Sequence, residues 1–335
     1  MTTASRKASG EPENTNEADV HGGTGGSSSP DRGVSTAGAG SSDRAGGTGS
    51  TQHPGGAGEA NPSRDERHFR LRHELRAVHA LIHRDLLRLA GYRTQTALML
   101  LQPALYLLIL GGGLAALIPR SQLGVGYQTY LFPGILMMTV QTPAIMVGVR
   151  LITDRQSGYL RELLMAPVHR TTLLLGNCAG GTLVATVQGA VLLGLAGAVG
   201  LPYDPLLLAL LLAAMILASF TITALALALA VSLRRPDLFH TLLGLVMMPL
   251  LFLSGGFFPL SSLPGWAHTL AAANPLAYAV DLLRRCIALR VPDQASVSGI
   301  EWAGGPPPLL VEAALLLVTG ILALLWAARR FSRPE

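Results

Sequence analysis

The stretch TALMLLQPALYLLILGGGLAALI, Thr96–Ile118, decides the fold, because it runs for 23 residues without a charged side chain. A helix of about 20 apolar residues crosses the hydrocarbon core of a bilayer, which is roughly 30 Å thick. The rest of the chain agrees with this pattern. Of its 335 residues, 50% are hydrophobic and only 13% are charged, whereas a soluble domain carries about 25% charged residues. The composition therefore argues against a soluble enzyme and for a polytopic membrane protein.

Five further apolar runs follow the first. Together they predict six spans, at approximately residues 96–118, 129–149, 178–199, 206–231, 241–260 and 308–328. Lipid offers no hydrogen-bond partners, so each span is expected to be an α-helix. The third run is rich in glycine, which predicts close approach of its neighbours. We therefore expect an all-α transmembrane domain over residues 94–335.

Two segments of different character precede the spans. Residues 1–65 are rich in Gly and Ser and poor in large apolar side chains, which predicts a disordered tail, most simply an inert linker. Residues 66–93 predict an amphipathic helix, because apolar side chains recur there every three or four residues. We expect this helix to lie in the membrane interface; the alternative is a helix packed on a soluble partner. The members of the apolar stripe are Leu71, Leu75, Val78, Ile82, Leu86 and Leu89.

The distribution of arginine predicts the orientation. With the amino terminus inside, the inner segments hold 17 arginines and the outer segments four, namely Arg120, Arg284, Arg285 and Arg290. Basic residues accumulate on the cytoplasmic side of membrane proteins. We therefore expect a multi-pass protein of the plasma membrane with both termini in the cytoplasm.

The outer stretch between the fifth and sixth runs is unusual. It holds SGGFFP (residues 254–259) and an alanine-rich segment that is broken at Asn274-Pro275. The stretch is too apolar for a free loop and too interrupted to span the membrane. We expect short re-entrant helices that dip back into the outer leaflet and are buried against protein.

Several classes of function are disfavoured. The chain has one lysine, Lys7, so it lacks the G-x-x-x-x-G-K-[ST] loop of a nucleotide-binding site. No aromatic residues interleave with the arginines, so we expect no nucleic-acid partner. Its two cysteines, Cys178 and Cys286, make no metal site by themselves. We expect no catalytic residues, metal or cofactor on this chain.

Two motifs resemble those of a known family. FLSGGFFPLSSLPGWAHTLAAANPLAYAVDLLRR (Phe252–Arg285) resembles the signature of ABC-2 type permeases, the membrane subunits of ATP-binding-cassette exporters. DRQSGYLRELLMAPVHRTTLLLGN (Asp154–Asn177) is similar to the cytoplasmic segment of the same family. The pattern is most similar to that of the daunorubicin-resistance permeases of actinobacteria. Lipo-oligosaccharide exporters of the nodulation type share the first motif. The resemblance covers about residues 68–335.

The resemblance implies an exporter subunit without enzymatic activity. It would dimerise with a second permease copy, in contact with membrane lipids, and would couple to a cytosolic ABC ATPase that holds ATP and Mg²⁺. The cargo would be an amphipathic drug-like or lipid-like molecule. One alternative is a lipo-oligosaccharide or polysaccharide exporter of the same family. Another is a secondary transporter driven by protons, which would need acidic side chains within its spans.

Three groups of candidate site residues follow. The loop at 150–172 is expected to form a short helix that contacts the ATPase; its alternative is a solvated loop that only fixes topology. The residues of this coupling group are Asp154, Arg155, Gly158, Arg161, Glu162 and Pro167. The expected outer gate, or alternatively an interfacial aromatic belt, is Phe257, Phe258, Pro259 and Trp266. Gln141, Gln188 and Glu312 are candidates for the substrate path. The two glutamines could instead join helices, and Glu312 could meet a cationic drug, pair with an outer arginine or reach water at the interface.

Overall fold

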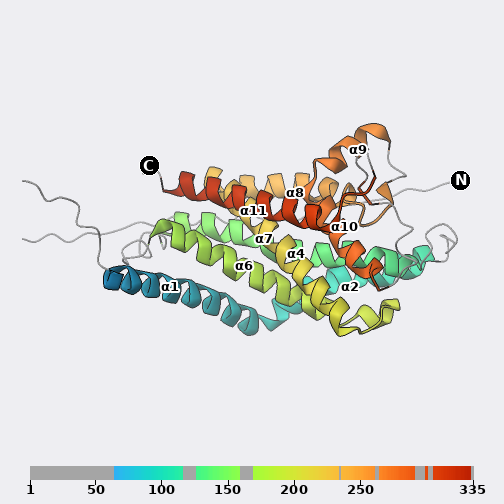
Figure 1. The fold of residues 1–335 in the computed structure, drawn as a ribbon, viewed down its shortest axis with the longest axis horizontal. Helices are drawn as coiled ribbons and strands as arrows, with labels where there is room; N and C mark the ends of the chain where they lie inside the picture. The colour runs from blue at the N-terminus through green and yellow to red at the C-terminus, as the bar shows by residue number, and fades with distance from the viewer. Residues whose placement is uncertain are drawn as a thin grey trace, which may run out of the picture. The chain divides into compact units, whose positions relative to one another are not determined.

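The computed structural model describes residues 64–115, 126–158, 169–233, 235–260, 264–290, 299–300 and 305–332. The chain divides into two units, Met1–Ala60 and Asn61–Glu335, and all described residues belong to the second. Every regular element in these ranges is a helix (Figure 1). The elements are α1 (Arg64–Gly91), α2 (Arg93–Ala115), α4 (Tyr127–Gln156), α6 (Arg170–Leu193), the 3-10 turn η1 (Ala196–Val199), α7 (Pro205–Ser232), α8 (Pro236–Phe252), α9 (Gly265–Ala272), α10 (Pro275–Ala288) and α11 (Leu309–Phe331).

Among the described residues, five helices are long and apolar enough to cross a membrane: α2, α4, α6, α7 and α11. A sixth apolar helix, α8, is shorter, with 17 residues. The all-helical fold and the presence of several membrane-spanning helices are therefore confirmed.

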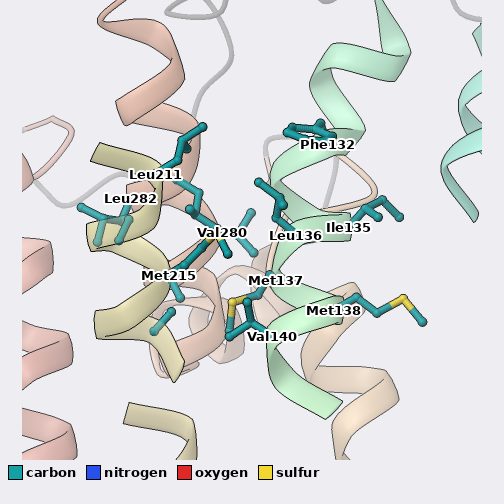
Figure 2. Packing of buried hydrophobic residues seen from close by; sticks show 14 of the residues in the cluster. Phe132, Ile135, Leu136, Met137, Met138, Val140, Leu211, Met215, Val280 and Leu282 are labelled. Carbon is teal, nitrogen blue, oxygen red and sulfur yellow. The ribbon is translucent and has the colours of Figure 1, made fainter. Parts of the chain in front are cut away.

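The helices α4, α6 and α7 pack against one another at the centre of the second unit. Figure 2 shows side chains of α4, such as Leu136 and Met137, facing Met215 of α7 and Val280 of α10. All four are buried. Lipid chains are as apolar as these side chains, so a hydrophobic driving force adds little within the membrane. Close packing and the many small dispersion contacts it creates hold the centre together instead.

Glycines of α6 permit this close packing, as predicted. A Cβ added at Gly181 would stand 2.3 Å from Val147 of α4, and one at Gly189 would stand 2.1 Å from Met215 of α7. Both distances are far shorter than a van der Waals contact. The glycines therefore let α4 and α7 approach α6 more closely than any larger residue would allow.

Two helices extend beyond the predicted spans on the same side of the unit. The helix α4 continues to Gln156, seven residues past the apolar run that ends at Val149. The helix α6 begins at Arg170, eight residues before the run that begins at Cys178. At 30 residues, α4 is about 45 Å long, which exceeds the hydrocarbon core. Hydropathy marks only the part of a helix that lipid surrounds, and polar side chains continue the helix into water.

The fifth and third predicted spans also end differently. The helix α8 ends at Phe252, because Ser254, Gly255 and Gly256 form a turn where the run had been extended to residue 260. Gly255 has φ +74°, a backbone conformation that only glycine adopts without strain. The helix α6 ends at Leu193, and only η1 continues the third run.

The helix α1 packs along α6 (Figure 1). Leu81 and Asp85 are buried there, against Gly176 and Gly180 of α6. The face of α1 that contacts α6 is therefore not the one that carries the predicted apolar stripe. Leu75 of that stripe is 67% exposed. The helix itself is confirmed, while its location in the membrane interface stays a prediction.

Candidate functional site

The end of α4 carries three of the predicted coupling residues. Asp154 and Arg155 are half-buried in the last turn, and the Arg155 guanidinium lies 5.4 Å from the ring centroid of Phe331 in α11. The backbone N–H of Ser157 donates to Thr153 and closes the helix. This end of α4 therefore touches the last turn of α11.

The structure describes the predicted short helix of the 150–172 loop only as far as Gly158, and this part is the end of α4. Gly158 has φ +77°, a left-handed conformation that ends α4 at this point. A Cβ at Gly158 would meet nothing within 4 Å, so the requirement for glycine is one of backbone conformation, not of space. The remaining coupling residues, Arg161, Glu162 and Pro167, lie outside the described residues.

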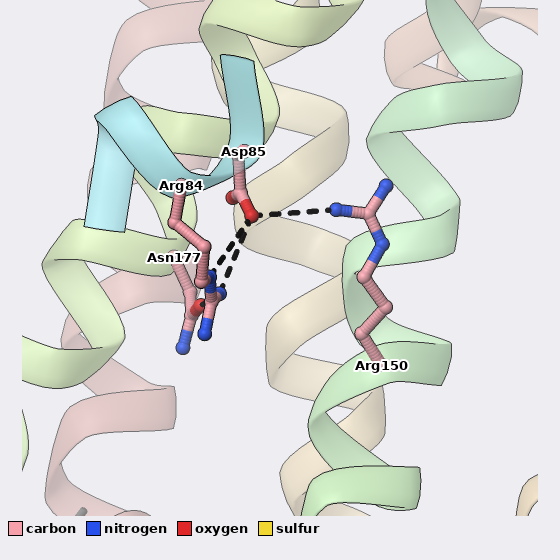
Figure 3. A network of polar contacts seen from close by, with 4 residues as sticks. All are labelled: Arg84, Asp85, Arg150 and Asn177. Carbon is pink, nitrogen blue, oxygen red and sulfur yellow. Dashed lines mark hydrogen bonds and ion pairs between the residues drawn. The ribbon is translucent and has the colours of Figure 1, made fainter. Parts of the chain in front are cut away.

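A network of polar and charged side chains joins α1, α4 and α6 nearly two turns before the end of α4 (Figure 3). Arg84 Nη2 lies 3.3 Å from Asp85 Oδ1. Arg150, on α4, approaches the same oxygen with its Nη1 atom at 3.7 Å. Arg84 Nη2 also donates to the amide oxygen of Asn177 in α6, at 3.3 Å. Asp85 is 2% exposed, so its charge depends on these two arginines for compensation.

This network was missed by the sequence analysis. Arg150 was only one of the 17 arginines predicted to lie inside, and Asp85 was not singled out. The signal that was present is Asp85 itself, an acidic residue about one turn after Ile82 of the predicted apolar stripe. The partners lie 65 residues apart in the chain and cannot be paired from one sequence.

The candidates for the substrate path lie in different surroundings. Gln188 of α6 is 4% exposed and lines a cavity of about 300 Å³ between α1, α2, α4 and α6. Gln141 of α4 is buried, and its amide oxygen has no hydrogen-bond partner among the described residues. Neither Gln141 nor Glu312 lines that cavity. The structure thus does not bring the three together.

Glu312 of α11 pairs with an outer arginine. Its carboxylate oxygen lies 2.9 Å from Arg285 Nη2 of α10, without the alignment of a hydrogen bond, and the side chain is fully buried. Arg285 also donates through Nε to Asp281 at 2.9 Å, and through Nη1 to the backbone carbonyl of Pro307. One arginine therefore holds two buried carboxylates and ties α10 to the start of α11. Glu312 does not reach water at the interface.

The predicted outer-gate residues do not form one cluster. Phe257 is buried, whereas Phe258 is 44% exposed and Trp266, on α9, is 69% exposed. Phe252 at the end of α8 contacts the rings of both phenylalanines. Pro259 is half-buried. The aromatic residues of this segment therefore divide between the protein interior and its surface.

The turn after α8 is fixed by polar side chains from other helices. Tyr130 of α4 donates its hydroxyl to the carbonyl of Gly255 at 2.9 Å, and Arg284 of α10 donates to the same carbonyl at 2.7 Å. The Arg284 guanidinium also lies 4.5 Å from the centroid of the Tyr130 ring. Tyr127 donates to the carbonyl of Phe257. Arg284 is thus a buried structural residue, a role that its count as an outer arginine did not reveal.

Comparisons with known proteins agree with this architecture. The family model described as ABC-2 type transporter matches residues 76–287. The chain is 30% identical over 217 residues to ycf38 of Porphyra purpurea, described as a transport permease, covering 63% of this chain and 73% of the relative. It is 30% identical to nodulation protein J of Rhizobium leguminosarum bv. viciae, over 55% of this chain and 71% of the relative. It is 26% identical to DrrC of Mycobacterium tuberculosis, described as a doxorubicin resistance ABC transporter permease, over 46% and 56%.

Proposed function

The chain belongs to the ABC-2 type transporter family, and from this premise we propose that it exports an amphipathic drug-like or lipid-like molecule with ATP hydrolysed by a separate cytosolic ATPase. The resemblance inferred from the two motifs is confirmed, and the chain is a permease subunit of an ABC transporter. Such permeases work with a nucleotide-binding subunit. The ATP and its Mg²⁺ would therefore be held by the partner, with no catalytic residue on this chain.

The end of α4, braced against α1 and α6, is the observation that best supports coupling. Both α4 and α6 project past their apolar runs on this side, so the proposal places these two helix ends outside the lipid. The ion pair of Asp85 with Arg150 joins α1 to α4, and the hydrogen bond from Arg84 to Asn177 joins α1 to α6. A push on the 150–172 region would therefore move three helices together and tilt α4 and α6 within the membrane.

The contacts of α8 support a sixth span. Near its start, the Phe239 ring lies against Gly148 of α4, and beyond its end Gly255 receives the hydroxyl of Tyr130, near the start of α4. Gly148 and Tyr130 are 18 residues apart, or about 27 Å along α4. The helix α8 and its turn thus cover nearly the thickness of the hydrocarbon core. The short helices α9 and α10 would then be re-entrant on the outer side.

A second copy would complete the transport path. Among the described spans, α2 exposes a row of large apolar side chains: Leu98, Leu101, Leu105, Leu108 and Ile109. The proposal places this face against lipid or the partner copy in a homodimer of the plasma membrane. The outer constriction would lie at the Phe257, Phe258, Pro259 and Trp266 segment, opened when the ATPase closes. Gln141, Gln188 and Glu312 remain candidates for contact with cargo.

The coupling proposal is tested in proteoliposomes that contain the permease and its ATPase. We expect Gly158→Val and Glu162→Ala to leave membrane insertion intact but to abolish ATP-driven efflux while ATP hydrolysis continues. Gly158→Val forces a β-branched residue into a left-handed conformation. The matched control is Gly200→Val, between η1 and α7, where glycine also has a left-handed conformation (φ +80°) and a Cβ meets nothing within 4 Å. Normal efflux, with substrate-stimulated hydrolysis, in both test variants would contradict the coupling role.

The same proteoliposomes distinguish this proposal from two alternatives. A lipo-oligosaccharide or polysaccharide exporter is favoured by the 30% identity to nodulation protein J; it would transport such a glycolipid in preference to a drug. A secondary transporter driven by protons would work without the ATPase. Its acidic groups would have to be Asp281 and Glu312, which Arg285 already compensates. Efflux that requires only a proton gradient would replace the proposal with this alternative.

A further inference from the structure

A cavity of about 300 Å³ lies where α1 meets α2 and both face α4 and α6. Exposed Arg88 and Tyr92 stand at its mouth. On the α4 side its lining runs from Arg150 to Pro143, seven residues or about 10 Å of helix. This volume is at the lower end of ligand pockets, and it suits a headgroup together with the first carbons of a chain.

The end of the cavity at Arg150 is rich in hydrogen-bond donors. Arg84, Arg88 and Arg150 act electrostatically on one another and on Asp85 and Asp154. Three arginines face two carboxylates, so one positive charge is left over. Arg88 has no ion pair with any described residue, and the ion pair of Arg150 with Asp85 is 3.7 Å long. Each guanidinium has five N–H donors, so both have donors to offer a ligand.

The other end is mainly apolar. Met99, Pro143, Met146 and Val184 line it, with the amide of Gln188 buried among them, and Gln95 and Thr96 add polar side chains from the start of α2. Gln188 is 4% exposed and forms no hydrogen bond with the residues that the structure describes. An amide that lies in the interior without a partner carries a free-energy cost. A ligand that places an ester or hydroxyl oxygen beside Gln188 would remove that cost.

We propose that this cavity binds the phosphate headgroup of an anionic amphiphile between Arg88 and Arg150, with its chain along the apolar wall and a polar oxygen at Gln188. The inference adds a binding site to the proposed function. Its relevance to transport rests on that function. A cationic headgroup fits poorly, because Asp85 already shares its charge between Arg84 and Arg150. Charge-assisted hydrogen bonds from guanidinium to phosphate are strong and often bidentate.

Native mass spectrometry of the purified full-length chain tests the proposal, because it resolves individual bound lipids. The probe is dioleoyl phosphatidic acid, compared with dioleoyl phosphatidylcholine at equal concentration. We expect a preference for phosphatidic acid, and about tenfold weaker binding of it in Arg88→Gln and in Arg150→Gln. Phosphatidylcholine binding should change in neither. The matched control is Arg329→Gln, an exposed arginine of α11 that does not line the cavity, which should bind like the original chain.

Equal affinity for the two lipids, or unchanged phosphatidic acid binding in Arg88→Gln, overturns the proposal. Arg88→Gln alters an exposed side chain and should fold, so its phosphatidic acid binding tests the proposal even if Arg150→Gln fails to fold. Displacement of the lipid by millimolar inorganic phosphate would show instead a site for the free anion, which also overturns it. The assay contains no ATP and no ATPase. Selective binding without ATP-driven efflux therefore contradicts only the proposed function, and efflux with unselective binding contradicts only this inference.

Discussion

Arg285 lies between two buried carboxylates, Asp281 and Glu312, and it contacts both at 2.9 Å. In a buried site, removal of one partner leaves charge that neither water nor protein compensates. The same residue binds the carbonyl of Pro307, just before α11 begins. Arg285 therefore joins α10 both to Glu312 of α11 and to the segment that leads into α11.

Arg285→Met should destabilise the protein by about 3 kcal/mol, the lower end of the cost of breaking a buried ion pair. Thermal unfolding in detergent measures the change. The control is Arg290→Met, which breaks the pair with Asp204, at 3.0 Å but with side chains 41% and 29% exposed. Exposed pairs contribute about 0–1 kcal/mol. Equal loss in both variants would contradict the role given to Arg285.

Adding Glu312→Gln to Arg285→Met should recover part of the lost stability, because only one carboxylate then remains without its arginine. Glu312→Gln alone should also change the dependence of efflux on pH or on cargo if Glu312 belongs to the transport path. An unchanged efflux profile would leave Glu312 with a structural role only.

At the scale of elements, the contact between α4 and the turn after α8 depends on two glycines. A Cβ at Gly134 would stand 2.5 Å from the carbonyl oxygen of Gly256. The clash is with backbone, which cannot move aside as a flexible side chain can. The bonds of Tyr130 and Arg284 to Gly255 need the same close approach. This is the physical reason for the paired glycines in SGGFFP.

Gly134→Ala should therefore lower stability by about 1–3 kcal/mol, as overpacking does in other tightly packed interiors. Thermal unfolding followed by tryptophan fluorescence measures it. Gly112→Ala is the matched control, since a Cβ there meets nothing within 4 Å and alanine is the better helix former. A Gly134→Ala protein as stable as Gly112→Ala would show that α4 and the turn can separate without cost.

The first and last residues of a helix could be predicted from the sequence where the helix ends at the border of the lipid, and less well elsewhere. The helix α7, Pro205–Ser232, differs from its predicted span by one residue at each end, because polar or helix-capping residues border a long apolar run. The ends of α4 and α6 were missed because Arg150 and Asn177 are polar, although they continue the helices outside the hydrocarbon. Asn274 was placed correctly at a break, and its side chain caps α10.

The candidate site divides in the same way. The pair of Asp281 and Arg285 is one helical turn apart, so its spacing was available within the recognised motif. The pair of Asp85 and Arg150 joins distant segments, and only the fold brings them within 3.7 Å. Gln188 was selected as a polar group within a span, but the cavity that it lines is formed by four helices.

At the scale of the whole molecule, the number of crossings decides where the carboxyl end lies. The five long helices alone make an odd number, which would place the end of α11 opposite the amino terminus. With α8 crossing as well, both ends lie on the same side. The arginines favour the second arrangement, because Arg329 and Arg330 then join the inner side. The position of α8 along α4, from Gly148 to Tyr130, favours it too.

Labelling of single cysteines in intact cells with a membrane-impermeant maleimide tests this count. The native Cys178 and Cys286 are buried and are replaced by alanine in the background chain. We expect Trp266→Cys, at an exposed position of α9, to react from outside, and Ser332→Cys, just beyond α11, to react only after permeabilisation. Tyr203→Cys, in the loop before α7, is the control, because six crossings and five both place it outside. Labelling of Ser332→Cys in intact cells together with protection of Trp266→Cys would mean that α8 turns back within the membrane, and the resulting odd count would separate the two termini.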